Sequence, residues 1–382
     1  MAEGLRRPAR AEISASALKH NVIAMKTLVG ESAFCCVVKA NGYGHGATLV
    51  APVALEGGAH SFGVAIVDEG IELRESGVTV PVLVQAEADP SAIEDGFANS
   101  LTLTVASLEG ARQVVRVAQK IGGVHRVHVK LDTGMHRMGV EPAHVDEVID
   151  VLDACTNIDV EGLFTHFSVA DGSSAEDRAF TRGQIKLFNE IADSLAARGT
   201  APRVRHLANS AGAMAYAEAR QSMVRCGLAV YGFYTQPWLA GALEEKGLGL
   251  REVMTVRARV SAVRRLAAGE RPSYGRQRAL VRESNVATVP FGYADGYARR
   301  LFEAGAEVLI RGRRHPLAGI VTMDQLIVDC GDDEVLVGDD VVLMGRQGAE
   351  EVSCEELALR AGTITHEIVC AVSARVPRVL VD

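Results

Sequence analysis

The chain has 382 residues, of which 48% are hydrophobic and 23% charged, and its formal net charge is −8. These values are typical of a folded protein of one to three domains, and they exclude a largely disordered chain. The acidic balance argues against nucleic acid or an anionic membrane surface as the partner.

Seven cysteines are scattered along the chain without a C-x-x-C pair. This usage is typical of buried free thiols in a reducing compartment. No apolar segment follows the two arginines of MAEGLRRPAR, so we expect no signal peptide. No stretch approaches the roughly 20 apolar residues that a membrane span needs. We therefore expect a soluble, cytoplasmic protein.

Eight short apolar or β-branched segments, bounded by glycine, proline or polar turns, are predicted as strands in the first two thirds of the chain. Helical patterns separate most of them, because strands that pair in parallel need crossovers of about a dozen residues. This alternation predicts an α/β fold, a (β/α)8 TIM-type barrel. NGYGHG reads G-x-G-x-G rather than G-x-G-x-x-G, which weakens the alternative of an open doubly wound sheet. The eight segments span residues 34–40, 61–67, 80–86, 101–107, 126–132, 160–166, 204–210 and 224–232.

Beyond about residue 248 the pattern changes to short strands with few helices. EVMTVRARVSAVRRL (252–266) alternates apolar and polar residues, and DVVLMG (340–345) is one of several later apolar runs. A period of two predicts strands with one buried face, so a mainly antiparallel all-β domain follows the barrel. We place the barrel at residues 11–245 and the all-β domain at 246–382, with residues 1–10 packing against the latter.

Polar residues fall at the carboxyl ends of five predicted barrel strands, which is where (β/α)8 enzymes place their active sites. Each has a structural alternative. Lys39 alone would be a solvated strand end, and His166 a hydrogen-bonded core histidine. Lys130 could pair with Asp132. The convergence of all five ends favours a site. They are Lys39, Lys130, His166, Asn209 with Ser210, and Arg225.

An anion site is predicted at the last two barrel strands. NSAGA begins a predicted helix at Asn209, where backbone N–H groups and the helix dipole favour an anion, although Asn209 and Ser210 could simply cap the helix. Gly227 adds bare backbone at the same barrel end. The histidines form no H-x-x-x-H or H-E-x-x-H pair, so no metal is expected, and G-x-S-x-G is absent. A lysine able to form an imine, together with a phosphate cradle, suggests pyridoxal phosphate.

Nine segments occur in the order and at the positions typical of one enzyme family. They are VVKANGYGHG, VHVKLDTGMHRMGV, GLFTHF, HLANSAGA, VRCGLAVYG, SYGR, VPFGYADGY, TMDQ and CAVSARVPR, between about residues 10 and 378. At these segments the chain resembles the alanine racemases. The resemblance implies a pyridoxal 5′-phosphate-dependent, fold-type III enzyme that interconverts L- and D-alanine by a two-base mechanism. It also implies a cytoplasmic homodimer that supplies D-alanine for bacterial peptidoglycan.

The resemblance implies a role for each matching residue. Lys39 would hold the cofactor as an imine and act as one catalytic base, and Tyr274, delivered by the partner subunit, would be the second. Two bases suit racemisation, because a proton leaves one face of the α-carbon and returns on the other. The implied cofactor contacts are Tyr43, Arg137, His166, Ser210, Arg225, Gly227 and Leu228, and the implied substrate contacts are Arg137, Tyr293 and Met323.

The resemblance also implies how these residues support one another. His166 would support the tyrosine, and Arg225 would hold His166 and donate to the pyridine nitrogen of the cofactor. Because arginine stays protonated, that nitrogen would remain unprotonated and the ring would be a weaker electron sink. Lys130 matches a lysine that is often carbamylated in the family, and the resulting anion would orient Arg137.

Three residues depart from the family's usual pattern. Ala374 stands where tyrosine is common, Cys226 where proline is, and Thr322 where cysteine is. Ala374 could weaken a phosphate contact or widen the site, which keeps a broader or serine-preferring racemase as an alternative. A related pyridoxal-dependent amino-acid decarboxylase would need a cysteine-bearing motif in place of SYGR and TMDQ. A non-enzymatic pyridoxal phosphate carrier would lack the all-β domain.

Overall fold

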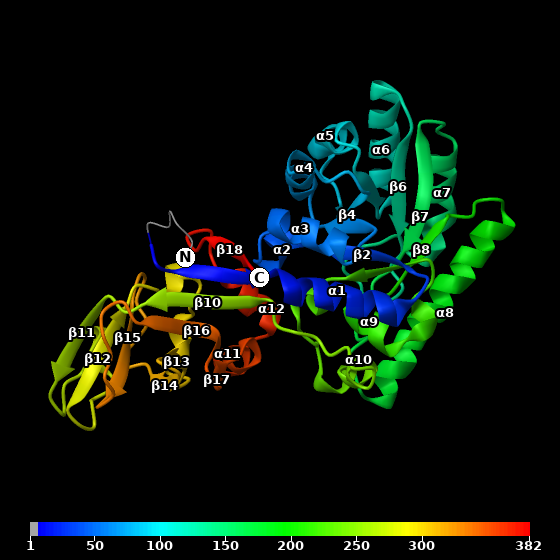
Figure 1. The fold of residues 1–382 in the computed structure, drawn as a ribbon. Helices are drawn as coiled ribbons and strands as arrows, with labels where there is room; N and C mark the ends of the chain where they lie inside the picture. The colour runs from blue at the N-terminus through cyan, green and yellow to red at the C-terminus, as the bar shows by residue number, and fades with distance from the viewer. Residues whose placement is uncertain (1–6) are drawn as a thin grey trace. The chain divides into compact units, whose positions relative to one another are not determined.

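The computed structural model describes residues 7–382, which divide into two units (Figure 1). The barrel unit holds Ser16–Gly42 and Ala47–Arg251. The β unit holds the described residues up to Ala15, together with Tyr43–Gly46 and Glu252–Asp382. Part of the predicted N-terminal packing, residues 1–6, lies outside the described residues.

Eight parallel strands form the sheet of the barrel unit, in the order β8-β7-β6-β5-β4-β3-β2-β9. β2 pairs with both β3 and β9, and the Arg225 amide donates to the Ala208 carbonyl at 2.9 Å between the ends of β9 and β8. The sheet is therefore a nearly closed barrel, and a strand overlaps each of the eight predicted segments. The strands are β2 Ala33–Val37, β3 Ser61–Val64, β4 Val82–Glu87, β5 Thr102–Val105, β6 His125–Lys130, β7 Ile158–Phe164, β8 Val204–His206 and β9 Met223–Cys226.

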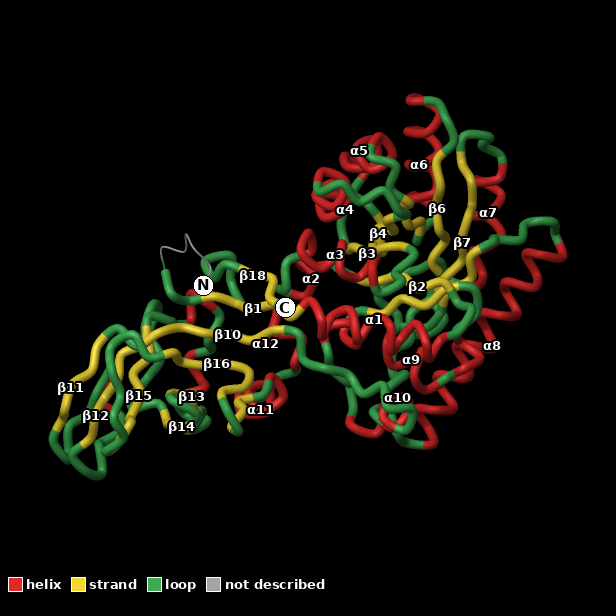
Figure 2. The backbone as a smooth tube through the Cα atoms, viewed as in Figure 1, coloured by secondary structure: helices red, strands yellow, loops and turns green. Residues whose placement is uncertain are grey.

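Helices alternate with these strands and lie around them (Figure 2). In α6, Ser107 caps the first turn by accepting from the Gly110 amide at 2.9 Å, and the helix ends before Gly122. Within residues 7–382, no helix is long and apolar enough to cross a membrane. The helices of this unit are α1 Ala15–Val29, α2 Lys39–Tyr43, α3 Ala47–Glu56, α4 Val67–Glu75, α5 Ile93–Ala98, α6 Leu108–Ile121, α7 Val145–Asp153, α8 Ala175–Ala197, α9 Ser210–Ala215 and α10 Gly241–Glu244, of which α1 and α2 each extend into residues grouped with the β unit.

The β unit confirms the mainly antiparallel all-β domain. One sheet has the order β14-β13-β16-β10-β1-β18 with β17 beside β16, and a second has the order β11-β12-β15. Every pairing is antiparallel except that of β1 with β18. Its elements are β1 Arg10–Ser14, β10 Met254–Arg259, β11 Ala262–Leu266, β12 Ser284–Val289, β13 Glu307–Ile310, β14 Arg313–Pro316, β15 Leu326–Gly331, β16 Asp340–Gln347, β17 Glu350–Val352, α11 Cys354–Ala361, α12 Thr365–Ala371 and β18 Arg378–Val381.

The structure divides the chain differently from the predicted boundaries. Residues 11–15, which we assigned to the barrel domain, belong to the β unit, because β1 lies between β10 and β18 and is hydrogen-bonded to both. Residues 43–46 also belong to this unit, and the later boundary falls at 251/252 rather than 245/246. The first difference arises from strand partners far away in the sequence, which local patterns do not reveal.

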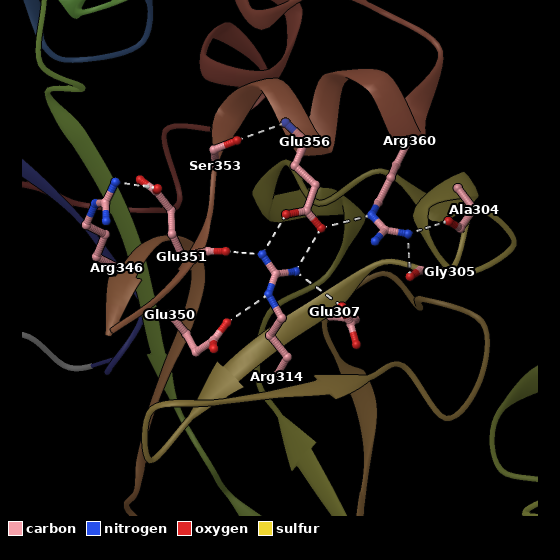
Figure 3. Close-up of polar contacts among 10 residues, drawn as sticks. All are labelled: Ala304, Gly305, Glu307, Arg314, Arg346, Glu350, Glu351, Ser353, Glu356 and Arg360. Carbon is pink, nitrogen blue, oxygen red and sulfur yellow. Dashed lines mark hydrogen bonds and ion pairs between the residues drawn. The ribbon is translucent and has the colours of Figure 1, made fainter. Parts of the chain in front are cut away.

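Arg314 connects β14 to three neighbouring elements of the β unit (Figure 3). Its guanidinium lies 2.8 Å from Glu356 of α11, 3.2 Å from Glu307 of β13 and 3.2 Å from Glu350 of β17, and it also donates to the Glu351 carbonyl. The hydrogen bond to Glu356 is the largest cause that raises the pKa of Arg314, and in return it lowers the pKa of that carboxyl. Charge-assisted bonds of this kind fix α11 against the sheet.

We expect Arg314→Met to lower the stability of the β unit by about 2 kcal/mol, because it leaves several half-buried carboxylates without their cation. Arg346→Met is the matched control. Arg346 pairs with Glu351 at the exposed edge of the same network, where such a pair contributes about 0–1 kcal/mol. Hydrogen exchange of the α11 peptide should accelerate in the first variant only. Equal acceleration in both would contradict this assignment.

Candidate functional site

Lys39 opens a left-handed turn directly after the first barrel strand. The four residues that follow it, 40–43, all have positive φ, with values of 52°, 52°, 63° and 51°. Only Gly42 among them lacks a Cβ, and this conformation costs other residues roughly 1–2 kcal/mol each. Strain of this kind is kept where the surrounding structure fixes it, most often at functional sites.

The barrel unit supplies the contacts that hold this turn. The Gly42 amide donates to the Val38 carbonyl at 2.7 Å, and the Ala40 amide donates to Glu69 at 2.6 Å. The Asn41 side chain accepts from the Ala47 amide at 2.8 Å, which links the turn to the start of α3. These contacts, with Val38 before the turn and with Glu69 and Ala47 after it, fix the conformation of the backbone that follows Lys39.

Arg225 in β9 is buried, with 3% exposure, and it has no ion pair with a carboxylate among the described residues. Its two terminal nitrogens donate to imidazole nitrogens of His166, at 3.3 Å, and His206, at 2.9 Å. They also donate to the backbone carbonyls of Thr165, His206 and Leu207, at 2.7, 2.9 and 3.2 Å. Its Nε–H has no partner within residues 7–382, so one donor is left for a ligand.

The charge of Arg225 persists at neutral pH. Burial lowers its pKa to about 10, because a guanidinium is stabilised less by the protein interior than by water. The side chain also lies over the Phe164 ring, with 5.1 Å to the ring centroid, which partly compensates the cation. An arginine held in this way suits an uncharged acceptor such as a pyridine nitrogen.

Lys130 adds a second buried cationic side chain, at the carboxyl end of β6. Burial, together with the positive charges of Arg225, Arg137 and Lys39, lowers its pKa to about 8. Its Nζ lies 5.6 Å from the centroid of the Phe164 ring. Four cationic side chains thus influence one another at one end of the barrel, which makes that end attractive to an anion.

His166 is held as a neutral imidazole. Burial is the main cause that lowers its pKa well below the usual value, followed by the charge of Arg225. Because arginine only donates, the Nδ1 of His166 accepts from Arg225, and the proton of the neutral ring lies on Nε2. His166 therefore presents a hydrogen-bond donor and no charge.

The predicted anion cradle is assembled between β8 and β9. The Ser210 hydroxyl accepts from the Gly227 amide at 3.1 Å and from the Ala229 amide at 3.4 Å. Asn209 caps α9 by accepting from the Gly212 amide at 2.9 Å, and Leu228 begins a 3-10 turn next to Gly227. A serine hydroxyl at the start of a helix, near the buried cation Arg225, fits a phosphate ester.

The remaining barrel-end residues are placed as follows. Arg137 lies in the exposed loop after β6, and its charge lowers the pKa of both Lys130 and His166. Tyr43 is grouped with the β unit, where its ring centroid lies 6.0 Å from that of His366. We predicted both Arg137 and Tyr43 as cofactor contacts. Arg137 belongs to the barrel unit, and Tyr43 is grouped with the β unit.

Three predicted residues of the β unit have exposed side chains. Tyr274, Tyr293 and Met323 are 70%, 42% and 53% exposed. Tyr274 lies between Ser273 and Gly275, with φ of 68° and 70°, and the Ser273 hydroxyl donates to the Ile320 carbonyl at 2.6 Å.

The loops that carry Tyr293 and Met323 are joined by backbone hydrogen bonds. The Tyr293 amide donates to the Thr322 carbonyl, and the next amide donates to the Met323 carbonyl, each at 3.0 Å. A Cβ on Gly292 would come within 2.3 Å of the Met323 carbonyl, so only glycine permits this approach.

The three departures have different surroundings. The Thr322 hydroxyl donates to the Gln325 carbonyl at 2.8 Å and closes a tight turn, which gives this residue a local function. Cys226 is buried in β9 next to Cys36 of β2. Ala374 is exposed, and it presents only a methyl group where tyrosine was expected.

Sequence reasoning missed His128, His206 and Gln85. The two histidines extend the hydrogen bonds of Arg225 into the barrel. Gln85 of β4 has a buried amide nitrogen without a hydrogen-bond partner among the described residues. The available signal was a polar residue within an otherwise apolar strand, and in RVHVKLD the spacing of two puts His128 on the same face as Lys130.

Known proteins match this chain along nearly its whole length. The family model for the N-terminal domain of alanine racemase matches residues 13–235, and that for the C-terminal domain matches residues 253–380. The alanine racemase of Symbiobacterium thermophilum is 43% identical over 97% of each chain. The crystal structure of alanine racemase from Bacillus anthracis with bound L-Ala-P has a TM-score of 0.92 and 33% identity, covering 99% of this chain and 96% of that one. A histidine racemase from Leuconostoc mesenteroides, 24% identical with a TM-score of 0.88 over 99% of each chain, shares the fold.

Proposed function

This chain belongs to the alanine racemase family, and we propose that it interconverts L- and D-alanine with pyridoxal 5′-phosphate as cofactor and Lys39 and Tyr274 as its two bases. The observation that carries the proposal is the surroundings of Arg225. This buried cation, which has no carboxylate partner within residues 7–382, keeps one N–H donor for a ligand, beside the buried amine of Lys130 and the Ser210 cradle.

The donor set fits the cofactor at both of its polar ends. Ser210, Gly227 and Leu228 would bind the phosphate, with Tyr43 as a further contact. Arg225 would donate to the ring nitrogen, and an arginine there keeps that nitrogen unprotonated. When bound, the cofactor supplies an electron sink that makes the α-hydrogen of the amino acid acidic.

Two residues of this chain would then move the proton. Lys39 would hold the cofactor covalently and, once released, serve one face of the α-carbon, and Tyr274 would serve the opposite face. Neutral His166, which offers its Nε2–H, would orient the phenolic oxygen and stabilise the phenolate. Arg137 would contact the cofactor and the substrate carboxylate, and Tyr293 and Met323 would line the substrate site.

We propose a homodimer in which each subunit completes the other's site. A phenol with an ordinary pKa near 10 needs nearby cations or donors to act as a base near neutral pH. Tyr274 is 70% exposed on its own subunit, in a loop whose flanking residues both have positive φ. The barrel end of a partner subunit carries the cations that could tune it.

A cytoplasmic supply of D-alanine for bacterial peptidoglycan is the role we propose for this activity. A broader or serine-preferring racemase is the second candidate, because Ala374 is a small exposed residue in a motif that usually carries tyrosine. Comparing kcat/KM for L-alanine and L-serine separates the two candidates.

The decisive experiment incubates the purified protein, loaded with pyridoxal phosphate, with L-alanine in deuterated water. We expect deuterium at the α-carbon together with formation of D-alanine until the two enantiomers are equal. A protein that binds the cofactor but leaves the α-hydrogen unexchanged would refute the proposal. Release of carbon dioxide from lysine, arginine or ornithine would instead indicate a decarboxylase.

We expect Lys130 to be carbamylated. Carbon dioxide reacts with the free amine, and with a pKa of about 8 roughly a tenth of Lys130 is free at pH 7, far more than of an ordinary lysine. The free fraction grows as the pH rises through 8, so a carbamate signal from ¹³C-labelled carbon dioxide should increase between pH 7 and 9. The signal should vanish in Lys130→Met and persist in Lys120→Met, a change at an exposed lysine. A signal that survives in Lys130→Met would exclude this site.

A further inference from the structure

A chain of hydrogen bonds leads from Arg225 into the interior of the barrel unit. Arg225 Nη1 lies 2.9 Å from Nδ1 of His206, and Nε2 of His206 lies 2.8 Å from Nδ1 of His128. His128 Nε2 then lies 3.2 Å from a carboxylate oxygen of Glu161. Both imidazoles are buried, and the His206 ring stacks on Phe164 at 4.6 Å between centroids.

The groups at the two ends allow the hydrogen bonds of this chain to be donated in only one direction. Arginine donates and cannot accept, so Nδ1 of His206 accepts and its proton lies on Nε2. That proton is donated to Nδ1 of His128, whose own proton therefore lies on Nε2 and is donated to Glu161. Burial lowers the pKa of both histidines, which keeps each ring neutral with a single proton. The carboxylate at one end only accepts and the guanidinium at the other only donates, so both ends require the same tautomers of the two histidines.

The backbone is shaped to place Glu161 at this position. β6 and β7 pair Val127 with Val160 and His128 with Gly162, so Glu161 is an extra residue in a bulge of β7. Bulges re-aim side chains. A Cβ on Gly162 would lie 2.6 Å from the His128 ring, so this glycine makes room for the imidazole.

Glu161 also pairs with two arginines that are not part of this series of hydrogen bonds. Arg126 lies 3.6 Å and Arg203 3.7 Å from its other carboxylate oxygen, and the hydrogen bond from His128 is the largest cause that lowers its pKa. Glu161 therefore remains an anion that accepts from His128 at neutral pH. None of the catalytic roles assigned above uses Glu161, His128 or His206.

We propose that Glu161 is a positioning residue for Arg225, acting through His128 and His206. By accepting at the far end of the chain, it fixes the tautomer of both histidines and so holds the Arg225 guanidinium with its Nε–H free for the cofactor. The functional part of this inference rests on the proposed function, whereas the tautomers are a property of the protein alone.

Three changes at Glu161 test the direction of the chain. Glu161→Gln keeps an acceptor and should preserve both tautomers. Glu161→Leu removes the acceptor. Glu161→Lys replaces it by a donor, which requires His128 to accept at Nε2 and to carry its proton on Nδ1. The probe is the ring ¹⁵N and ¹H spectrum of histidine-labelled, full-length protein without cofactor, in which the two tautomers have distinct nitrogen shifts.

Activity of the loaded protein should follow the same order. We expect kcat to fall about tenfold in Glu161→Leu and more in Glu161→Lys, with KM for alanine changed less than about twofold, as for the loss of one buried charge-assisted hydrogen bond. Gly162→Ala should reproduce the Glu161→Leu effect without removing any polar group, because the new methyl displaces His128. Asp159→Asn is the matched control. Asp159 is in the same strand and accepts from Arg203 at 2.7 Å. Within residues 7–382 it has no hydrogen bond to His128, on which it acts only through its charge.

Two results would overturn the proposal. One is a His128 ring that keeps its proton on Nε2 in Glu161→Lys. The other is a kcat in Glu161→Leu and Gly162→Ala equal to that of Asp159→Asn. If the leucine or lysine variant does not fold, Gly162→Ala and Glu161→Gln still give opposite expectations. A wild-type protein that shows the expected tautomers but no racemisation would refute the proposed function and leave the hydrogen-bond chain intact.

Discussion

Lys39→Ala is expected to lower kcat/KM for alanine racemisation by at least about 1,000-fold. The change removes both the covalent attachment of the cofactor and one of the two bases, and either loss alone accounts for about 100- to 10,000-fold in comparable enzymes. Cofactor binding should persist, because Arg225 and the cradle of Ser210 and Gly227 are unchanged.

Borohydride reduction followed by peptide mapping checks this assignment independently of activity. In the wild-type protein the reduced cofactor should remain on the peptide that contains Lys39, and in Lys39→Ala no peptide should carry it. Lys120→Ala, at an exposed lysine that pairs with Glu94, is the control and should keep both activity and labelling. A cofactor found on Lys130 instead would exchange the roles of the two lysines.

Two inactive variants are expected to restore each other's activity when their subunits are mixed. Tyr274→Phe should also lose racemisation by about 1,000-fold, because one face of the α-carbon then lacks its base. Exchange of the α-hydrogen should persist for the one enantiomer that Lys39 serves. Such one-sided exchange is specific to the loss of a single base.

In a mixed dimer of Lys39→Ala and Tyr274→Phe, one site contains both changes and the other contains neither. With equal and random mixing, half of the dimers are mixed and each has one intact site, so about a quarter of the wild-type activity should return. Mixing Lys39→Ala with Lys39→Met restores no lysine and should stay inactive. A Lys39→Ala and Tyr274→Phe mixture that also stays inactive would place both bases in one subunit.

The barrel strands could be predicted because each lies in a short segment rich in apolar or β-branched residues and bounded by turn residues, and such a segment needs no distant information. The position of β1 could not, since five residues with alternating burial acquire their place only from β10 and β18. The left-handed turn after Lys39 was equally hidden. It contains a single glycine, and contacts from Glu69 and Ala47 hold its other residues in that conformation.

The site was predictable where a residue's chemistry is visible at a strand end, as for Lys39, Lys130 and Arg225. What local sequence cannot give is which partner a buried polar group has. Arg225 contacts His166, as the resemblance implied, but it also contacts His206, whose link to His128 joins strands far apart in the sequence. A histidine in an apolar strand indicates that a hydrogen-bond partner exists, but it does not indicate which residue that partner is.

The pairing of β1 with β10 and β18 has a consequence for the order in which the protein folds during synthesis. β1 leaves the ribosome first, yet its partners follow only after roughly 240 and 360 further residues, which takes tens of seconds at about 5–20 residues per second. The barrel strands can assemble in that interval, because all of their pairings except that of β2 with β9 join strands that are consecutive in the sequence. We therefore expect β1, although it is made before the barrel strands, to be among the last strands to reach its native sheet, and the synthesis of β18 to complete that sheet.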